Sequence, residues 1–135
     1  MIQNLRSDKG GFTLVEIMIV VAIIGLLAAI AVPSFIRART RSQATTILNE
    51  CRMLDAALDQ YALENSKQQS SNATFADLTP YLKAGSKLAT NGGSDTLGNG
   101  FTLGGKVSDG IKVSGTTKTA LSTATGGDAF WGPYS

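Results

Sequence analysis

The residue types that enzymes use for acid–base and covalent chemistry are scarce in this chain. It has no histidine, which removes imidazole general bases, Ser-His-Asp triads and histidine-ligated zinc. Cys51 is the only cysteine, so neither an internal disulfide nor a two-cysteine metal site can form. Because Cys51 lies within a helical pattern of apolar residues, we interpret it as a small core residue rather than a nucleophile. The sequence therefore predicts a protein that is not an enzyme and needs no cofactor.

One carboxylate stands out by its position. Glu16 is the only charged residue of segment 12–36, which reads FTLVEIMIVVAIIGLLAAIAVPSFI. A carboxylate within such a segment costs roughly 3 kcal/mol on membrane-insertion scales, so it is normally retained for a function. A cut between Gly11 and Phe12 would create an α-amine that carries the opposite charge. Helical geometry makes this pairing hard within one chain, so we expect Glu16 to pair with the Phe12 amine of a neighbouring subunit.

The apolar segment itself predicts a membrane helix. At about 1.5 Å per residue it would be about 37 Å long, which is enough to cross a bilayer. The weakly basic segment before it favours a cytoplasmic N-terminus, whereas three arginines between residues 37 and 41 favour the opposite orientation, so charge alone leaves the topology open. An alternative is a general secretory signal peptide, because Ala29-Ile30-Ala31 has the small-x-small pattern of its cleavage site.

The residues around Glu16 resemble a known processing signal. Residues 9–16, KGGFTLVE, are similar to the type III signal of type IV prepilins and type II secretion pseudopilins. The resemblance implies that a membrane prepilin peptidase removes the leader 1–11 by cutting after Gly11. It also implies that the same enzyme methylates the new amine of Phe12.

Gly25 and Pro33 mark the weakest part of the apolar helix. Glycine costs about 1 kcal/mol in a helix interior, and proline removes a backbone donor and clashes with the preceding turn. Pro33 also lies where members of that family usually carry a proline. The resemblance implies that the stretch between the two residues can melt in a packed filament. A simple proline kink in a membrane helix remains the alternative.

Location and partners also follow from the resemblance. It implies a bacterial inner-membrane protein that spans the membrane once, with a cytoplasmic N-terminus before cleavage, and later a periplasmic or extracellular filament. The implied partners are further copies of the chain in a helical homo-oligomer, the prepilin peptidase, the inner-membrane assembly platform with its secretion ATPase, and membrane lipid before assembly.

Three functions remain open. We favour a pseudopilin of type II protein secretion, because the globular part is small and lacks the C-terminal disulfide loop common in major pili. The first alternative is a type IV pilin for adhesion, twitching motility or DNA uptake. The second, from a different class, is a single-pass membrane or secreted binding module.

Helical periodicity continues beyond the apolar segment, without glycine or proline after Pro33, to about Asn65. The chain is therefore expected to comprise the leader 1–11, a transmembrane and filament-core helix 12–36, and a globular domain 37–135 that includes the second half of the long helix. An apolar stripe recurs at spacings of three and four residues: Ala44, Ile47, Leu48, Cys51, Leu54, Leu58, Tyr61 and Ala62. The intervening polar residues are expected to face solvent: Arg41, Gln43, Glu50, Arg52, Asp59 and Gln60.

The fold class predicted for the chain is α+β, with the long N-terminal helix packed on a small antiparallel sheet, as in pilins. After a polar break at 66–72, Thr74 is expected to cap a short helix over 75–78, and Thr79-Pro80 to start a further turn. Segments 101–103, 106–108 and 111–113 alternate apolar and polar residues, and Gly104-Gly105 and Asp109-Gly110 between them suit hairpin turns. We expect a small meander that packs on the stripe, together with four apolar residues: Leu121, Phe130, Trp131 and Tyr134.

Charge and acidic residues predict no further ligand. The net charge is +2 and the lysines of the C-terminal half are scattered, so no nucleic-acid partner is expected. The family resemblance implies that major pseudopilins often bind calcium in a C-terminal loop. Asp95, Asp109 and Asp128 lie in glycine-rich loops, but they form no dense acidic cluster. No metal site is predicted, and these three residues are weak calcium candidates.

Overall fold

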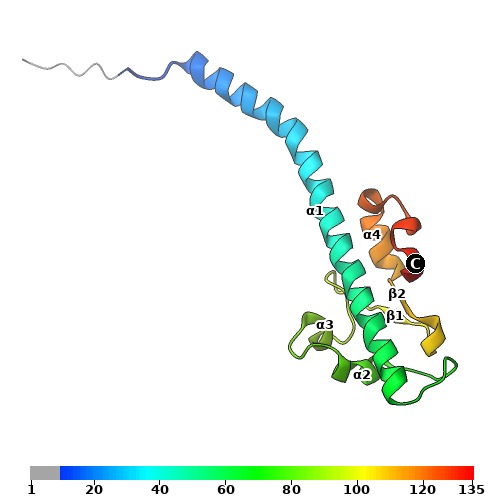
Figure 1. The fold of residues 1–135 in the computed structure, drawn as a ribbon. Helices are drawn as coiled ribbons and strands as arrows, with labels where there is room; N and C mark the ends of the chain where they lie inside the picture. Colours follow the sequence, from blue (N-terminus) through cyan, green and yellow to red (C-terminus); the bar gives the residue numbers. More distant parts are fainter. Residues whose placement is uncertain (1–9) are drawn as a thin grey trace, which may run out of the picture. The chain divides into compact units, whose positions relative to one another are not determined.

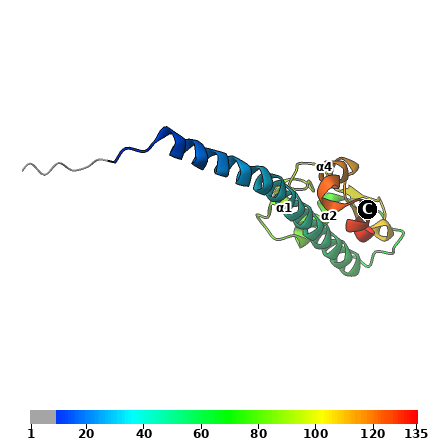
Figure 2. The same ribbon diagram turned by 90° about the horizontal axis from the view of Figure 1, so that it is seen from above.

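A computed structural model describes residues 10–135, so residues 1–9 of the predicted leader lie outside the described residues. One helix, α1 (Leu14–Glu64), contains 51 residues and confirms the predicted long helix within two residues at its start. The chain divides into two compact units, the first ending at Ile36 and the second covering Arg37–Ser135. In Figures 1 and 2 the second half of α1 lies beside the short helices and the hairpin of the second unit.

The end of α1 follows from its local sequence. Ser66 has a left-handed backbone (φ 48°), and Asn65 bonds the Tyr61 carbonyl with both its backbone and side-chain nitrogens. The amide of Lys67 donates to the Ala62 carbonyl at 2.8 Å, and the Ser66 amide donates to that of Leu63 at 3.4 Å. This bond pattern is the Schellman motif, which satisfies the last free carbonyls of a helix. It places the predicted polar break directly after α1.

Nine short elements follow in the second unit. The helices are α2 (Phe75–Leu78), α3 (Lys87–Thr90) and α4 (Gly115–Thr125). The strands are β1 (Thr102–Leu103) and β2 (Ile111–Lys112), and the 3-10 turns are η1 (Thr79–Tyr81), η2 (Val107–Asp109), η3 (Asp128–Phe130) and η4 (Gly132–Tyr134). The described chain therefore has the predicted α+β fold, a long helix packed with a small antiparallel sheet.

The predicted cap of the first short helix is confirmed. The carboxylate of Asp77 accepts hydrogen bonds from the backbone amide of Thr74 at 2.9 Å and from its hydroxyl at 2.7 Å. These two bonds lower the pKa of Asp77. The predicted turn at Thr79-Pro80 is η1, in which proline occupies a first-turn position that needs no amide donor.

The predicted three-stranded meander is wrong. Within residues 10–135 the sheet consists of β1 and β2 alone, in the register Thr102↔Lys112 and Leu103↔Ile111. The segment expected as the middle strand belongs to the connection between them, and its Lys106 forms an isolated bridge with Asn72. Its amides bond elsewhere: Val107 donates to Ser71 at 3.0 Å and Ser108 to Gln69 at 2.9 Å. Gly104-Gly105 and Asp109-Gly110 therefore lie at the two ends of one wide connection between β1 and β2, and they do not form two hairpin turns. The hydrogen-bond acceptors of this segment, Ser71 and Gln69, lie in the polar break after α1. Sequence periodicity gives no sign of such a distant pairing.

Two helices were not predicted. α4 begins after Ser114 and ends at Gly126, whose left-handed backbone (φ 75°) caps it. Its sequence, GTTKTALSTAT, is rich in threonine and has little helical periodicity, so it gives no sign of a helix, although Leu121 packs in the core as expected. α3 is a single turn whose N-cap is Ser86, because the Ser86 hydroxyl accepts the Ala89 amide at 3.3 Å.

The core confirms the predicted stripe of α1. Its buried apolar residues are Ala44, Ile47, Cys51, Leu54, Ala57 and Leu58, with Leu48 and Tyr61 partly buried against them. The rest of the chain contributes Ala73, Leu78, Leu88, Ile111, Val113, Leu121 and Trp131. The aromatic C-terminus closes this core as expected: Phe130 and Trp131 meet edge to face at 5.2 Å, and the Val113 amide donates to the Tyr134 carbonyl at 2.9 Å.

The predicted exposure of Glu50 is wrong. Glu50 was expected to face solvent, but it exposes only 7% of its surface. It follows Ile47 by three residues and precedes Leu54 by four, so it lies on the buried side of α1. The charge of Glu50 predicts a solvent-exposed position, whereas its spacing from Ile47 and Leu54 fits the buried face of α1.

Candidate assembly site at the start of the long helix

The proposed cleavage point lies in exposed, non-helical chain. Gly10 and Gly11 have no other atoms near the place where a side chain would begin, and Phe12 exposes 85% of its surface. Helix α1 begins at Leu14, so the Gly11–Phe12 peptide bond precedes the first helical turn. An exposed peptide bond outside the helix is accessible to a peptidase. The residues before it, 1–9, lie outside the part of the chain described.

Glu16 and Thr13 cap the start of α1. The Glu16 carboxylate oxygen Oε2 accepts hydrogen bonds from the Thr13 amide and from the Thr13 hydroxyl, each at 3.2 Å. The Glu16 amide in turn donates to the Thr13 hydroxyl at 3.2 Å. This reciprocal arrangement is a capping box, and the negative carboxylate also lies at the positive end of the helix dipole. Glu16 therefore has a local partner within its own chain.

Sequence reasoning missed the role of Thr13. The signal was present, because a threonine followed three residues later by a glutamate, before an apolar run, is the capping-box pattern. The predicted pairing of Glu16 with the Phe12 amine of a neighbour concerns an assembled state and stays a prediction. Both interactions can use the same carboxylate at different stages, since only Oε2 is bonded to Thr13.

The apolar half of α1 is exposed along its length. The exposed large side chains of this part are Leu14, Val15, Ile17, Met18, Ile19, Val20, Val21, Ile23, Ile24, Leu26, Leu27, Ile30, Val32, Phe35 and Ile36. An 18-residue window of α1 reaches a mean hydropathy of 2.9, and within the described residues this is the one helix long and apolar enough to cross a membrane. Side chains of this kind need lipid or other helices around them.

Helix α1 continues through Gly25 and Pro33 without interruption. The predicted melting of this stretch concerns a packed filament and stays a prediction. A Cβ added at Gly25 would meet nothing within 4 Å, so no contact among residues 10–135 requires glycine there.

The three calcium candidates are not brought together. Asp95 is buried, and its carboxylate accepts the amides of Leu97 and Asn99, each at 2.9 Å, as well as the Thr117 hydroxyl. Asp109 is exposed in η2. Within residues 10–135 no group of three or more His, Cys, Asp or Glu side chains is placed to hold a metal ion. The calcium prediction stays untested.

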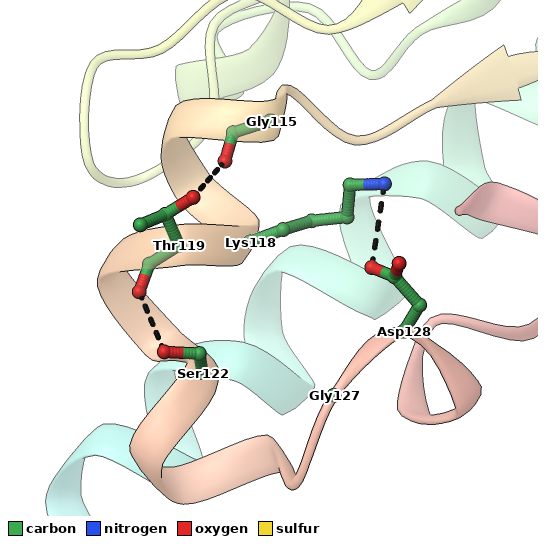
Figure 3. A pocket seen from close by; sticks show the side chains of 6 residues that line it. All are labelled: Gly115, Lys118, Thr119, Ser122, Gly127 and Asp128. Carbon is green, nitrogen blue, oxygen red and sulfur yellow. Dashed lines mark hydrogen bonds and ion pairs between the residues drawn. The ribbon is translucent and has the colours of Figure 1, made fainter.

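Asp128, the third candidate, belongs to a polar pocket beside α4. Figure 3 shows the pocket, whose volume is about 360 Å³ and which is lined by Gly115, Lys118, Thr119, Ser122, Gly127 and Asp128. The Lys118 ammonium pairs with the Asp128 carboxylate at 3.4 Å. The hydroxyls of Thr119 and Ser122 donate to carbonyls of α4, at 2.9 and 2.8 Å. The polar groups of this pocket are thus largely occupied by one another.

Cys51 is a buried core residue, as predicted. Burial raises the pKa of its thiol to about 12, and the nearby carboxylates of Glu50, Asp95 and Asp55 act in the same direction. A thiol with so high a pKa is protonated at neutral pH and is a poor nucleophile. This environment fits a structural role and not a catalytic one.

Comparison with known proteins identifies the N-terminal region. Residues 6–32 match the family described as "Prokaryotic N-terminal methylation motif". The chain is 48% identical over 73 residues to a fimbrial protein of Pseudomonas aeruginosa, a match that covers 54% of this chain and 46% of the relative. It is 43% identical over 63 residues to the type IV major fimbrial protein FimA of Dichelobacter nodosus, covering 47% and 39%.

A third relative comes from a secretion system. The type II secretion system core protein G of Pseudomonas aeruginosa is 42% identical over 60 residues, covering 44% of this chain and 42% of that protein. The chain spans less than half the length of each of these three relatives. No solved structure matches the chain.

These matches and the geometry of the helix start define a protein with a prepilin-type N-terminus on an apolar helix. The N-terminal part of the chain is similar to type IV pilins and to type II secretion pseudopilins. Its motif and exposed apolar helix fit a membrane-anchored, pilin-like subunit.

Proposed function

We propose that the chain is a structural, non-catalytic subunit of a helical filament, and within that class a pseudopilin of type II protein secretion. The observation that carries the filament role is the methylation motif at 6–32, placed at the start of an exposed apolar helix. An apolar surface of this kind suits lipid before assembly and a bundle of like helices afterwards. In this proposal the prepilin peptidase, the inner-membrane platform and its secretion ATPase are the assembly partners.

Processing is the first test of this proposal. The mature chain should begin at Phe12 with a methylated amine and retain Ala29, which N-terminal peptide mass spectrometry measures directly. Gly11→Val should leave the leader attached, because the peptidase must fit the residue before the cut. A mature chain that begins at Val32 would mean that the segment is an ordinary signal peptide, and the filament proposal would fail.

A type IV pilin is the second candidate, supported by the fimbrial relatives, one of which is 48% identical over 73 residues. The absence of a second cysteine favours the secretion role, because the chain cannot close a disulfide loop. Deletion of the gene in its native host distinguishes the two roles. Loss of exoprotein secretion, with surface filaments and twitching intact, supports the pseudopilin, and the opposite result supports the pilin.

A further inference from the structure

Three arginines directly after the apolar segment are not explained by the proposed function. Arg37, Arg39 and Arg41 lie in α1, and all three are exposed. With the expected cytoplasmic N-terminus they lie on the other side of the membrane, where basic residues beside a spanning helix are disfavoured. Their presence there needs a separate cause. We call these three residues the arginine collar.

The arginine collar has no negative partner within its own chain. No aspartate or glutamate occurs between Glu16 and Glu50, so this stretch of α1 carries only positive charge. In the part of the chain that the structure describes, the one ion pair joins α4 to η3. Arg37 and Arg41 are four residues apart on one face of α1, where like charges repel each other. A bound anion would remove this repulsion.

The side chains of the collar leave the helix in different directions. At about 100° per residue, Arg39 lies about 160° around α1 from Arg37 and from Arg41, and all three start within about 6 Å along the axis. One protein surface would meet one of these directions, whereas a layer of lipid headgroups encloses the whole helix. Within residues 10–135 no three acidic side chains gather closely enough to hold a metal ion, so a second copy offers the collar no compact acidic cluster.

The type of basic residue indicates phosphate as the partner. Every basic residue of α1 is an arginine, whereas every basic residue after α1 is a lysine. A guanidinium group is planar and its paired donors match two oxygens of a phosphate, while an ammonium group acts as a point charge. Arginine is therefore the residue expected where the chain binds phosphate groups.

We propose that the arginine collar binds the phosphates of anionic phospholipid headgroups at the membrane surface. The proposal rests on the membrane stage of the proposed function, before the subunit enters a filament. Each guanidinium group pairs with one headgroup, which its long side chain reaches from the end of the apolar segment. These contacts fix the depth of α1 in the bilayer, and they break when the subunit is extracted.

The test uses the full chain reconstituted in phosphatidylcholine vesicles with a trace of spin-labelled phosphatidylglycerol or spin-labelled phosphatidylcholine. The motionally restricted fraction of each label gives the relative affinity of the two lipids for the protein. We expect phosphatidylglycerol to be preferred about fivefold in about 0.1 M NaCl, which corresponds to one basic side chain per headgroup. The preference should fall below about twofold in about 1 M NaCl, because salt screens the charges.

One variant removes the charge of the collar: Arg37→Gln, Arg39→Gln and Arg41→Gln. Its matched control removes as many charges from exposed lysines of the second unit: Lys67→Gln, Lys83→Gln and Lys112→Gln. The collar variant should lower the preference at least about threefold, and the control should keep it. The leader retains its two basic residues in both, so the difference between them measures the collar. A third variant with Arg→Lys at the three collar positions should keep part of the preference, because the charge remains without the planar donors.

An unchanged preference in the collar variant, or an equal loss in the lysine control, would overturn the proposal. Inorganic phosphate that removes the preference far more strongly than NaCl of equal ionic strength would also overturn it, because the collar would then bind a free anion. A collar variant that keeps the lipid preference but fails to enter filaments would assign the collar to pairing between copies. Because the lipid measurements use the unassembled chain, their failure leaves the filament proposal intact.

Discussion

Glu50 and Cys51 are neighbours on α1, and burial alters the chemistry of both in the same direction. Removing either group from water disfavours its charged form, so the pKa of each is raised. The physical consequence differs because the two groups begin from different values. Cys51 becomes inert across the physiological range, whereas Glu50 takes up its proton at a higher pH than a free carboxylate does. Each residue gives a prediction that can be measured in the isolated protein.

Cys51 should resist alkylation in the folded chain. With a pKa of about 12 instead of 9.0, its thiolate fraction at pH 8 is lower by roughly three orders of magnitude. We expect iodoacetamide to modify the native protein at least about 100-fold more slowly than the protein in guanidinium chloride. Gln60→Cys in a Cys51→Ala background places a thiol at an exposed position of the same helix and should react quickly. Equal rates in native and denatured protein would contradict the burial of Cys51.

Glu50 should make the fold more stable as the pH is lowered from neutral towards 4.5, its pKa in the unfolded chain. Its folded pKa lies above the unfolded value of 4.5, so the native state binds protons more tightly, and this contribution is lost as the pH rises through the folded pKa. Asp55 acts in the same direction, because burial and Asp59 raise its pKa. Asp77, whose pKa is lowered, matters only below about 3.8.

Denaturant unfolding in the presence of a chelator measures this dependence. Glu50→Gln should flatten the increase in the free energy of unfolding as the pH falls towards 4.5, and Glu64→Gln should leave it unchanged. Lys87 and Asp95, the other charged groups facing Glu50, remain in both variants. A variant Glu50→Gln with the full slope of the parent would show that Asp55 and other groups carry the effect.

At the scale of elements, the start of α1 combines capping with assembly. The Thr13–Glu16 capping box gives the Glu16 carboxylate two hydrogen-bond donors within its own chain, so this carboxylate has partners in the apolar segment before assembly. The proposed pairing with the amine of a neighbour would replace or add to this bond. The two interactions are separable, because Thr13 contributes to the first and not to the second.

Glu16→Ala should give a processed, membrane-resident protein that enters filaments poorly. Removing one partner of a buried pair costs about 3–5 kcal/mol, and every subunit would repeat the defect. Glu16→Asp should be intermediate, since the charge remains but its reach is shorter. Thr13→Ala should lose only the cap, which is worth about 1 kcal/mol, and should assemble far better than Glu16→Ala.

The assay compares sheared and membrane fractions by immunoblot after expression with the assembly machinery. Glu64→Gln serves as the control for removal of an exposed carboxylate elsewhere on α1. If Thr13→Ala and Glu16→Ala fail equally, the local cap explains the role of Glu16 and the pairing between subunits is withdrawn. Normal filament yield from Glu16→Ala would contradict both explanations.

The elements also show which parts of the fold are encoded locally. α1, with its stripe around Leu54, and the Thr74 cap of α2 were predicted because periodicity and capping act within a few residues. The pairing of segment 106–108 with segment 69–72 was not predicted, because it joins residues that are far apart in the sequence. The cavity of about 230 Å³ beside Glu50 was not predicted for the same reason: its lining comes from α1, from α3 and from the loop around Asp95.

At the scale of the whole molecule, the two compact units differ in whether their apolar side chains are exposed or buried. The unit ending at Ile36 exposes its apolar side chains, whereas Arg37–Ser135 holds the buried core. Each residue of that core lies within the second unit, from Ala44 to Trp131. The unit can therefore bury its apolar surface without help from the apolar half of α1, which predicts independent folding.

A fragment from Arg37 to Ser135 should be soluble, monomeric and folded. We expect blue-shifted fluorescence of the buried Trp131, and a single cooperative transition in urea. Leu54→Ala should lower the free energy of unfolding by about 2–5 kcal/mol, because it leaves a cavity beneath α1. Leu63→Ala, at a position of the same helix with 81% of its surface exposed, should change it by no more than about 0.5 kcal/mol. Filaments formed by this fragment would place assembly outside the apolar helix, and an unfolded fragment would mean that the first unit is needed for the core.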